Sequence, residues 1–295
     1  MWVLEYKRIS LSMQDDYLAL LDLTGSVTAD HCFPVLFGWD QVLEYRLMFH
    51  DGLCWIRQER PRPVYLAPVG DWQGRDWERE LALHLPLGAE VLSVPEELAL
   101  EWGRQLGGRI LLEEDRDAFE YLHLTEDLAH LKGNRYMRKR NHVNRFARQF
   151  SYRYGEMTPD DLERIVDLQR RWCAARDCSG SFVLEGENRA IMRVLDNYQA
   201  LRGLVGGYVE VGGSVVAYAI GEGRGDTLFV HFEKGDPAYG SVYQVINREF
   251  ALHNLGFKFL NREEDMGDPG LRDAKMSYLP MDFVRKHRAV LRPGS

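Results

Sequence analysis

The sequence has 295 residues, of which 45% are hydrophobic and 28% are charged, and its formal net charge at pH 7 is −8. This length allows one large domain or two domains of about 100 to 150 residues, and the composition excludes a wholly disordered chain. The four cysteines form no CxxC pair and the polar start MWVLEYKRIS does not resemble a signal peptide, which indicates a cytoplasmic protein. Because the most apolar stretch, residues 203–221, contains Glu210 and Ser214, we expect no transmembrane segment.

Residues 1–124 are predicted to form an N-terminal lobe in which helical and strand patterns alternate. Asp51-Gly52 is typical of a hairpin turn and joins two of the predicted strands. The predicted helices cover residues 12–23, 30–38, 77–85 and 96–106, and the predicted strands cover residues 43–49, 53–58, 64–67, 90–94 and 109–113.

Residues 125–295 are predicted to form a C-terminal lobe that includes a basic helix at 132–150. Thr158 and Pro159 mark the start of a helix that ends near Ala175. Ser241 and Gln244 have the spacing of a capping box for a later helix. The other predicted elements are strands at 150–157, 203–211, 214–221, 227–233 and 257–261, and helices at 185–198 and 241–254.

This element order resembles the GNAT acyltransferase fold, in which an acyl donor lies between the last strand of the meander and the strand after the next helix. The N-terminal half follows a similar order, although its residues do not repeat. The predicted fold class is therefore α/β (α+β), with tandem GNAT-like acyltransferase domains. Each domain is expected to have a mixed, largely antiparallel sheet flanked by helices.

The segment between Asp127 and Glu156 is strongly basic and contains no acidic residue, so the rest of the chain has twice the net negative charge of the whole. Like charges at helical spacing repel one another, and a bound phosphate would relieve that repulsion. Transfer RNA, a phosphorylated cofactor and an anionic lipid headgroup all fit, and a solvated basic helix is the alternative. The eight basic residues are Lys132, Arg135, Arg138, Lys139, Arg140, Arg145, Arg148 and Arg153.

The predicted basic helix has two distinct faces. Tyr136 and His142 are candidates to stack on a base, although a tyrosine on an apolar helix face is more often a core residue. The apolar face is expected to carry Tyr136, Val143, Ala147 and Phe150, and the polar face Arg138, Asn141, Arg145 and Arg148.

The loop at residues 231–241 lies where a GNAT enzyme normally binds the pyrophosphate of coenzyme A with backbone amides. Asp236 would repel pyrophosphate and Pro237 has no amide donor, so coenzyme A bound in the usual manner is not expected. The alternative interpretation of this segment is a simple connecting turn.

A charged segment follows the strand at 257–261 and contains Glu263 and Asp265. Carboxylates at this position can hold a substrate ammonium or accept its proton, and Lys275 can stabilise an oxyanion. An acidic surface loop is the alternative. The chain has no HExxH or paired-cysteine metal pattern, no GxSxG nucleophile motif and no phosphate loop, so we expect neither a metal nor a required cofactor.

Three passages, LKGNRYMRKRNHVNRF, YGSVYQVINREFA and LNREEDMGDPGLRDAKMSYLP, resemble the DUF2156 family. Its members are similar to the C-terminal catalytic domain of phosphatidylglycerol lysyltransferase, which moves an amino acid from aminoacyl-tRNA to a lipid headgroup. DHCFPVLFGWD and RPVYLAPVG support the resemblance more weakly. The large membrane-spanning region of the lipid-modifying enzymes is absent from this sequence, which leaves the acceptor open among a lipid headgroup, a peptide and a small amine.

The resemblance implies a site with a donor side, a reacting centre and a lining. The leading hypothesis is an aminoacyltransferase that uses aminoacyl-tRNA. The alternatives are an acyl-CoA-dependent N-acyltransferase and a non-catalytic protein that binds RNA or an anionic membrane. The candidate catalytic residues are Glu233, Glu263, Asp265 and Lys275; the donor-binding residues are Arg138, Lys139, Asn141, His142 and Arg145; the lining residues are Tyr136, His231, Tyr239, Tyr243, Asn247 and Arg262.

Overall fold

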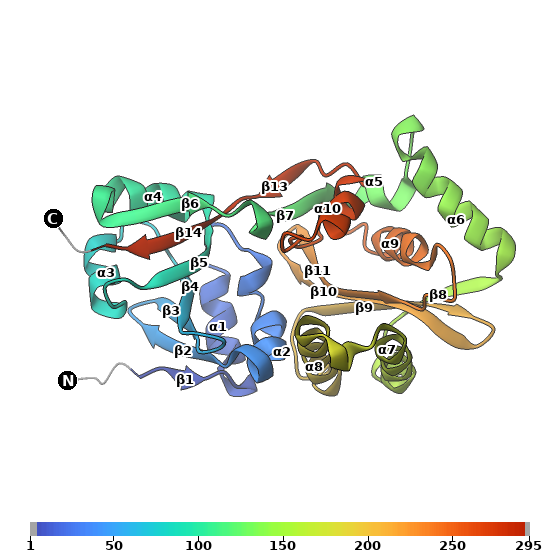
Figure 1. Cartoon of the computed structure of the whole chain (residues 1–295), viewed down its shortest axis with the longest axis horizontal. Helices are drawn as coiled ribbons and strands as arrows, with labels where there is room; N and C mark the ends of the chain where they lie inside the picture. Colours follow the sequence, from blue (N-terminus) through green and yellow to red (C-terminus); the bar gives the residue numbers. More distant parts are fainter. Residues whose placement is uncertain (1–4, 293–295) are drawn as a thin grey trace. The chain divides into compact units, whose positions relative to one another are not determined.

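The computed structural model describes residues 5–292, which divide into two compact units. Unit 1 contains residues up to 120 together with 264–268 and the residues from 284 onwards, and unit 2 contains residues 121–263 and 269–283. Each unit is built on one seven-stranded sheet (Figure 1). No helix within residues 5–292 has the length and apolar character needed to cross a membrane.

The sheet of unit 1 contains an antiparallel meander followed by a parallel strand. Asp51 and Gly52 have positive φ values of 47° and 72°, which confirms the predicted hairpin turn. The strands, in spatial order, are β1 (Lys7–Arg8), β2 (Tyr45–His50), β3 (Leu53–Gln58), β4 (Val64–Gly70), β5 (Glu90–Pro95), β14 (Lys286–Leu291) and β6 (Ile110–Glu114).

Four helices pack on this sheet: α1 (Gln14–Leu21), α2 (Phe33–Leu43), α3 (Trp77–His84) and α4 (Glu96–Leu106). The apolar residues of α4 recur at helical spacing, and Leu98, Trp102 and Leu106 are all buried. Together with Trp55 and Trp77 they belong to one hydrophobic core. Burial of these large side chains accounts for the position of α3 and α4 on the sheet.

The sheet of unit 2 has a corresponding order, with an antiparallel meander and then a parallel strand. The predicted meander is confirmed, although its middle strand extends three residues further than expected, to Arg224. The strands, in spatial order, are β13 (Asp282–Val284), β7 (Glu120–Leu124), β12 (Phe259–Asn261), β11 (Thr227–Gly235), β10 (Ser214–Arg224), β9 (Leu204–Val211) and β8 (Tyr152–Glu156).

Helices cover both faces of the second sheet. Helices α6 (Met137–Gln149) and α9 (Val242–His253) lie on one face, and α7 (Leu162–Arg176) and α8 (Phe182–Asp196) lie on the other (Figure 1). Two shorter helices, α5 (Thr125–His130) and α10 (Pro269–Met276), precede the basic helix and follow β12, respectively. Val143 and Phe146 of α6 pack against Phe250 of α9 in the core of this unit.

In each sheet, one strand lies between two strands that are not its neighbours in the sequence. In unit 1, β14 lies between β5 and β6, and in unit 2, β7 lies between β12 and β13. Strand β14 therefore comes from a part of the sequence remote from the rest of its sheet, whereas β7 directly precedes β8 of its own sheet in the chain. The sequence analysis placed residues 284–292 with the C-terminal lobe, whereas the pairing of β14 with β5 and β6 puts this strand in the sheet of unit 1.

A buried lysine fastens β14 within unit 1. Lys286 is fully buried, and its Nζ lies 2.6 Å from Asp30, 3.0 Å from Glu120 and 3.4 Å from Glu264. The Glu120 carboxylate also accepts a hydrogen bond of 2.8 Å from the backbone amide of Ala29. A charge removed from water requires such partners, so this network ties β14 to three other segments of the unit.

Local structure both confirms and corrects the sequence analysis. The capping box predicted at Thr158 is present, with Asp161 as its partner. The one predicted at Ser241 is wrong, because Ser241 has a φ of 74° and caps no amide with its side chain. A disulfide joins Cys173 to Cys178, which the absence of a CxxC pair did not suggest.

Candidate functional site

The sheet of unit 2 opens between β11 and β12. These two strands pair only from Thr227 to Phe229, opposite residues 259–261, although β11 continues to Gly235. After Asn261 the chain instead stays paired with β7, because Arg262 N donates to Tyr121 O (2.9 Å) and Tyr121 N donates to Glu263 O (3.2 Å). The side chains that follow Asn261, where the pairing of β11 with β12 ends, therefore lie beside those of β11.

Glu233, Arg262 and Asn247 form the centre of the candidate site. The Arg262 guanidinium lies 3.3 Å from the Glu233 carboxylate, and both side chains are about 15% exposed. With its amide oxygen turned towards Arg262, Asn247 accepts from the guanidinium Nε at 3.1 Å. All three residues are candidates predicted from the sequence, and the structure brings them together from β11, α9 and the end of β12.

Tyr278 and Lys139 extend this group towards the basic helix. Arg262 and Lys139 both lie against the ring of Tyr278, with Arg262 Cζ at 5.0 Å and Lys139 Nζ at 3.8 Å from its centroid. Lys139 Nζ also donates to Ser277 Oγ at 2.6 Å. Burial and the nearby Arg262 lower the pKa of Lys139 to about 8.

Lys275 lies beneath the same segment. It is buried, and its Nζ donates to the backbone carbonyl of Arg262 at 2.6 Å. His123 on β7 is also buried, and burial followed by the charges of Arg262 and Lys275 lowers its pKa to about 3. His123 is therefore neutral at physiological pH, and Lys275 is placed to hold the backbone at Arg262.

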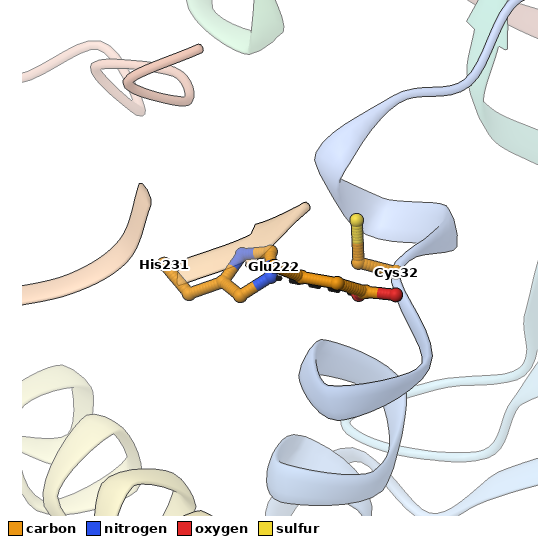
Figure 2. A group of neighbouring side chains, drawn as sticks. All are labelled: Cys32, Glu222 and His231. Atoms are coloured by element: carbon orange, nitrogen blue, oxygen red, sulfur yellow. Dashed lines mark ion pairs between the residues drawn. The ribbon is translucent and has the colours of Figure 1, made fainter. Parts of the chain in front are cut away.

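A second charged group consists of His231, Glu263 and Glu222. His231 Nδ1 donates to Glu263 at 2.7 Å, and its Nε2 lies 3.8 Å from the Glu222 carboxylate, a pair drawn in Figure 2. Arg224 Nε lies 3.0 Å from the other oxygen of Glu222. Burial alone would lower the pKa of His231, but the two carboxylates raise it to about 9. The imidazole is therefore a buried cation at neutral pH.

The basic helix also contacts the loop before α9. Ser241 Oγ accepts from Arg145 at 2.7 Å and lies 3.0 Å from His142 Nδ1. These two bonds explain why Ser241 does not cap α9. Burial, followed by the charges of Arg145 and Lys139, lowers the pKa of His142, so it is neutral near pH 7.

The apolar face of the basic helix differs in detail from the prediction. Ala147, expected on the apolar face, is exposed, and Phe146, which was not assigned to either face, is buried there. Tyr136 is only 1% exposed and donates to Tyr278 O at 3.2 Å, so it is a core residue and cannot stack on a base. Arg138 and Asn141 are exposed, as the polar face requires.

The remaining lining residues lie around the same loop. Tyr239 packs its ring against Phe150, with centroids 5.1 Å apart. The Tyr243 hydroxyl accepts from Trp172 Nε1 at 3.0 Å, a partner that the sequence did not reveal. Trp172 also lies 4.3 Å from Lys234 Nζ, which pairs with Glu187.

Asp265 has a different environment from the other predicted catalytic residues. It belongs to unit 1, is fully buried, and accepts from the backbone amide of Gly267 at 2.9 Å. Its carboxylate also lies 3.5 Å from Arg116. These contacts give Asp265 a structural role in the turn, and its catalytic role stays a prediction that none of these contacts supports.

The comparisons with known proteins identify the family. The family described as phosphatidylglycerol lysyltransferase, C-terminal, matches residues 23–290. This chain belongs to that family. A conserved protein of unknown function from Bacteroides thetaiotaomicron is 31% identical and has a similar structure, with a TM-score of 0.89 over 98% of this chain and 100% of that one.

Two further relatives bear on fold and length. The C-terminal DUF2156 domain of a putative lysylphosphatidylglycerol synthetase from Agrobacterium fabrum has a TM-score of 0.68 at 13% identity, covering 96% of this chain and 91% of that chain. An uncharacterised protein of Mycoplasmoides gallisepticum is 23% identical over 64% of this chain, and the match spans only 61% of that relative. This member of the phosphatidylglycerol lysyltransferase C-terminal family has, as predicted, a mixed α/β fold with two sheets flanked by helices, and it shares this fold with the Agrobacterium domain.

Proposed function

We propose that this protein transfers an aminoacyl group from aminoacyl-tRNA to an amine or hydroxyl acceptor, and that it acts in the cytoplasm, where charged tRNA is made. The observation that carries the proposal is a group of cationic side chains in unit 2. Lys139 of α6 and Arg262 lie against the same Tyr278 ring, Arg262 lies beside Glu233, and Arg138 is exposed on α6. A polyanion on α6 would thereby place its end beside a carboxylate group.

The loop before α9 argues against coenzyme A as the donor. The Ala238 amide donates to the Asp236 carboxylate, and those of Tyr239 and Val242 donate to carbonyls within the loop. Pro237 has no amide hydrogen. These three amides are therefore engaged within the loop and not directed at a pyrophosphate, and Asp236 adds a repelling charge.

In the proposed reaction the acceptor attacks the ester carbonyl that joins the amino acid to the tRNA ribose. Glu233, kept in place by Arg262 and Asn247, would bind the ammonium group of the amino acid. We assign Lys275 to the tetrahedral oxygen, either directly or through the Arg262 segment that it holds. No covalent intermediate with the protein is needed.

Filter binding to tRNA charged with labelled amino acids tests the donor directly. We expect selective retention of charged over uncharged tRNA, which would also identify the amino acid, and no thermal stabilisation by coenzyme A. Stabilisation by coenzyme A without retention of tRNA would favour the acyl-CoA-dependent reaction. Tight RNA or liposome binding without any turnover would favour a binding protein.

Charge reversal on the exposed face of α6 tests how the donor is bound. Replacing Arg138 and Arg145 with glutamate should weaken binding of charged tRNA at least tenfold. The logarithmic salt dependence should flatten by about 0.7 for each phosphate that the variant no longer neutralises. Arg170→Glu, a reversal on α7 at an exposed arginine paired with Asp167, serves as the matched control and should leave binding unchanged. Equal effects of both reversals would contradict a specific site on α6.

The lowered pKa of Lys139 predicts a pH dependence of donor binding. An ammonium that loses its proton near pH 8 attracts phosphate below that pH and not above it. We therefore expect donor affinity, measured between pH 6.5 and 9.5 at constant ionic strength, to fall as the pH rises through about 8. Lys139→Arg should remove this fall because a guanidinium stays charged throughout the range. The same fall in the variant would exclude Lys139 as its cause.

A further inference from the structure

We propose that Glu222 and His231 are positioning residues that hold the Glu263 carboxylate as the proton acceptor of the transfer reaction. This inference rests on the proposed function and deepens it, because it chooses one carboxylate among the candidates and adds Glu222. The geometry that carries it is the row Glu222, His231 and Glu263, in which each imidazole nitrogen faces a carboxylate.

The backbone at Glu263 is held in a conformation that a free chain avoids. Its φ is 56°, in the left-handed region that costs a residue with a side chain about 1 kcal/mol or more. Hydrogen bonds fix it there, since Glu263 N donates to the Asn261 side chain at 2.9 Å and Glu263 O accepts from Tyr121 N. Strained residues that are fixed in this way are concentrated at active sites.

The side chains in the row differ in exposure. Glu222 and His231 are each 1% exposed, whereas Glu263 is 23% exposed. Only Glu263 can therefore reach a substrate, and the other two lie behind it. Arg224 Nε lies 3.0 Å from Glu222 and adds a positive charge beside this row.

The row has a defined chemical consequence. A doubly protonated imidazole donates through Nδ1 to Glu263 and directs its Nε2 hydrogen towards Glu222. The hydrogen bond fixes the plane of the Glu263 carboxylate, and thereby the direction from which its oxygens can accept a proton. A histidine held between two carboxylates keeps this orientation over a wide pH range, because both of them favour its charged form.

The group-transfer step balances without another reactant. The acceptor oxygen or nitrogen forms a bond to the ester carbonyl carbon, and its proton passes to Glu263. The carbon–oxygen bond to the tRNA ribose then breaks, and Glu263 returns the proton to the departing ribose oxygen. The products are the aminoacylated acceptor and uncharged tRNA, with Glu263 regenerated.

Single-turnover transfer by saturating enzyme separates this role from donor binding. We expect Glu263→Gln to lower the rate at least 100-fold and Glu222→Gln about tenfold, with the affinity for charged tRNA changed less than twofold. Glu222→Asp, which keeps the charge, should recover much of the rate. Glu210→Gln is the matched control, because Glu210 is a carboxylate on the same sheet that pairs with Arg153 and Arg164, and it should react at the parent rate.

The pH profile and a proton NMR titration give readouts that a merely structural role would not change. In the parent protein His231 should titrate near pH 9, and in Glu222→Gln both its titration and the alkaline limb of the rate profile should move to lower pH. A parent His231 that titrates near 6.5, an unchanged alkaline limb, or loss of activity on chelation of a metal bound by His231 would each overturn the proposal. If the parent protein transfers no aminoacyl group, the proposed function fails, and the NMR titration still tests the row by itself.

Discussion

Replacing Lys286 with methionine is expected to lower the free energy of unfolding of unit 1 by about 3 to 5 kcal/mol. The reason is electrostatic. Lys286 is the positive charge that pairs with Asp30, Glu120 and Glu264, and without it the fully buried Glu120 would lie beside two other carboxylates with no opposite charge from Lys286. Denaturant unfolding followed by tryptophan fluorescence measures this loss, because Trp55, Trp77 and Trp102 are all buried in unit 1.

The neighbouring residue supplies the control for this prediction. Arg285 is 49% exposed and lies 3.7 Å from Glu114, so Arg285→Met should cost less than about 1 kcal/mol. The loss in Lys286→Met should also shrink at low pH. Burial already raises the pKa of Glu120 in the folded protein. A carboxyl group whose pKa is higher in the folded state than in the unfolded state stabilises the fold at a pH below its unfolded pKa. This stabilisation is lost as the pH rises through the folded pKa. Equal stabilities of the two variants, or a loss independent of pH, would contradict a charge-based role for Lys286.

Replacing Arg262 with alanine should lower aminoacyl transfer at least 100-fold, which is the largest effect on activity that we expect outside Glu263. The change removes the partner of Glu233, the donor to Asn247 and one of the two cations on Tyr278. Arg262→Lys should recover little, because an ammonium cannot reproduce the planar set of donors.

The measurement for Arg262 is single-turnover transfer beside donor affinity and thermal unfolding. Arg248→Ala on α9 is the control, since Arg248 pairs with Glu249 at 2.8 Å and takes no part in the Glu233 group. A similar loss in both variants would indicate general damage to unit 2. Full activity of Arg262→Ala would remove the Glu233 group from the proposed mechanism.

The order of helices and strands could be predicted largely from local patterns. The meander of unit 2 and the helix that starts after Thr158 follow from alternation, turn residues and a capping box, all of which act over a few residues. The place of β14 between β5 and β6 could not be predicted in this way. It depends on pairing between residues far apart in the chain, and local sequence patterns in β14 do not indicate which strands it pairs with.

For the site as well, individual residues could be predicted from local sequence, but contacts between remote segments could not. Glu233, Asn247 and Arg262 were named from their segments, and the structure joins them. Glu222 was missed because Gly221 and Gly223 flank it and suggest a turn, whereas β10 continues through them. Tyr136 was named because an aromatic ring in a basic segment can stack on a base, but its place on the apolar face puts it in the core.

The place of β14 between β5 and β6 has a consequence for how the protein is made. A chain leaving the ribosome presents β5 and β6 early, but the strand that lies between them is encoded near the end of the sequence. The N-terminal half therefore cannot complete its sheet during synthesis, unlike an ordinary first domain. Until β14 emerges, β5 and β6 expose strand edges that are open to pairing with other chains. Emergence of β14 from the ribosome thus becomes the event that closes unit 1 and ends its exposure to aggregation.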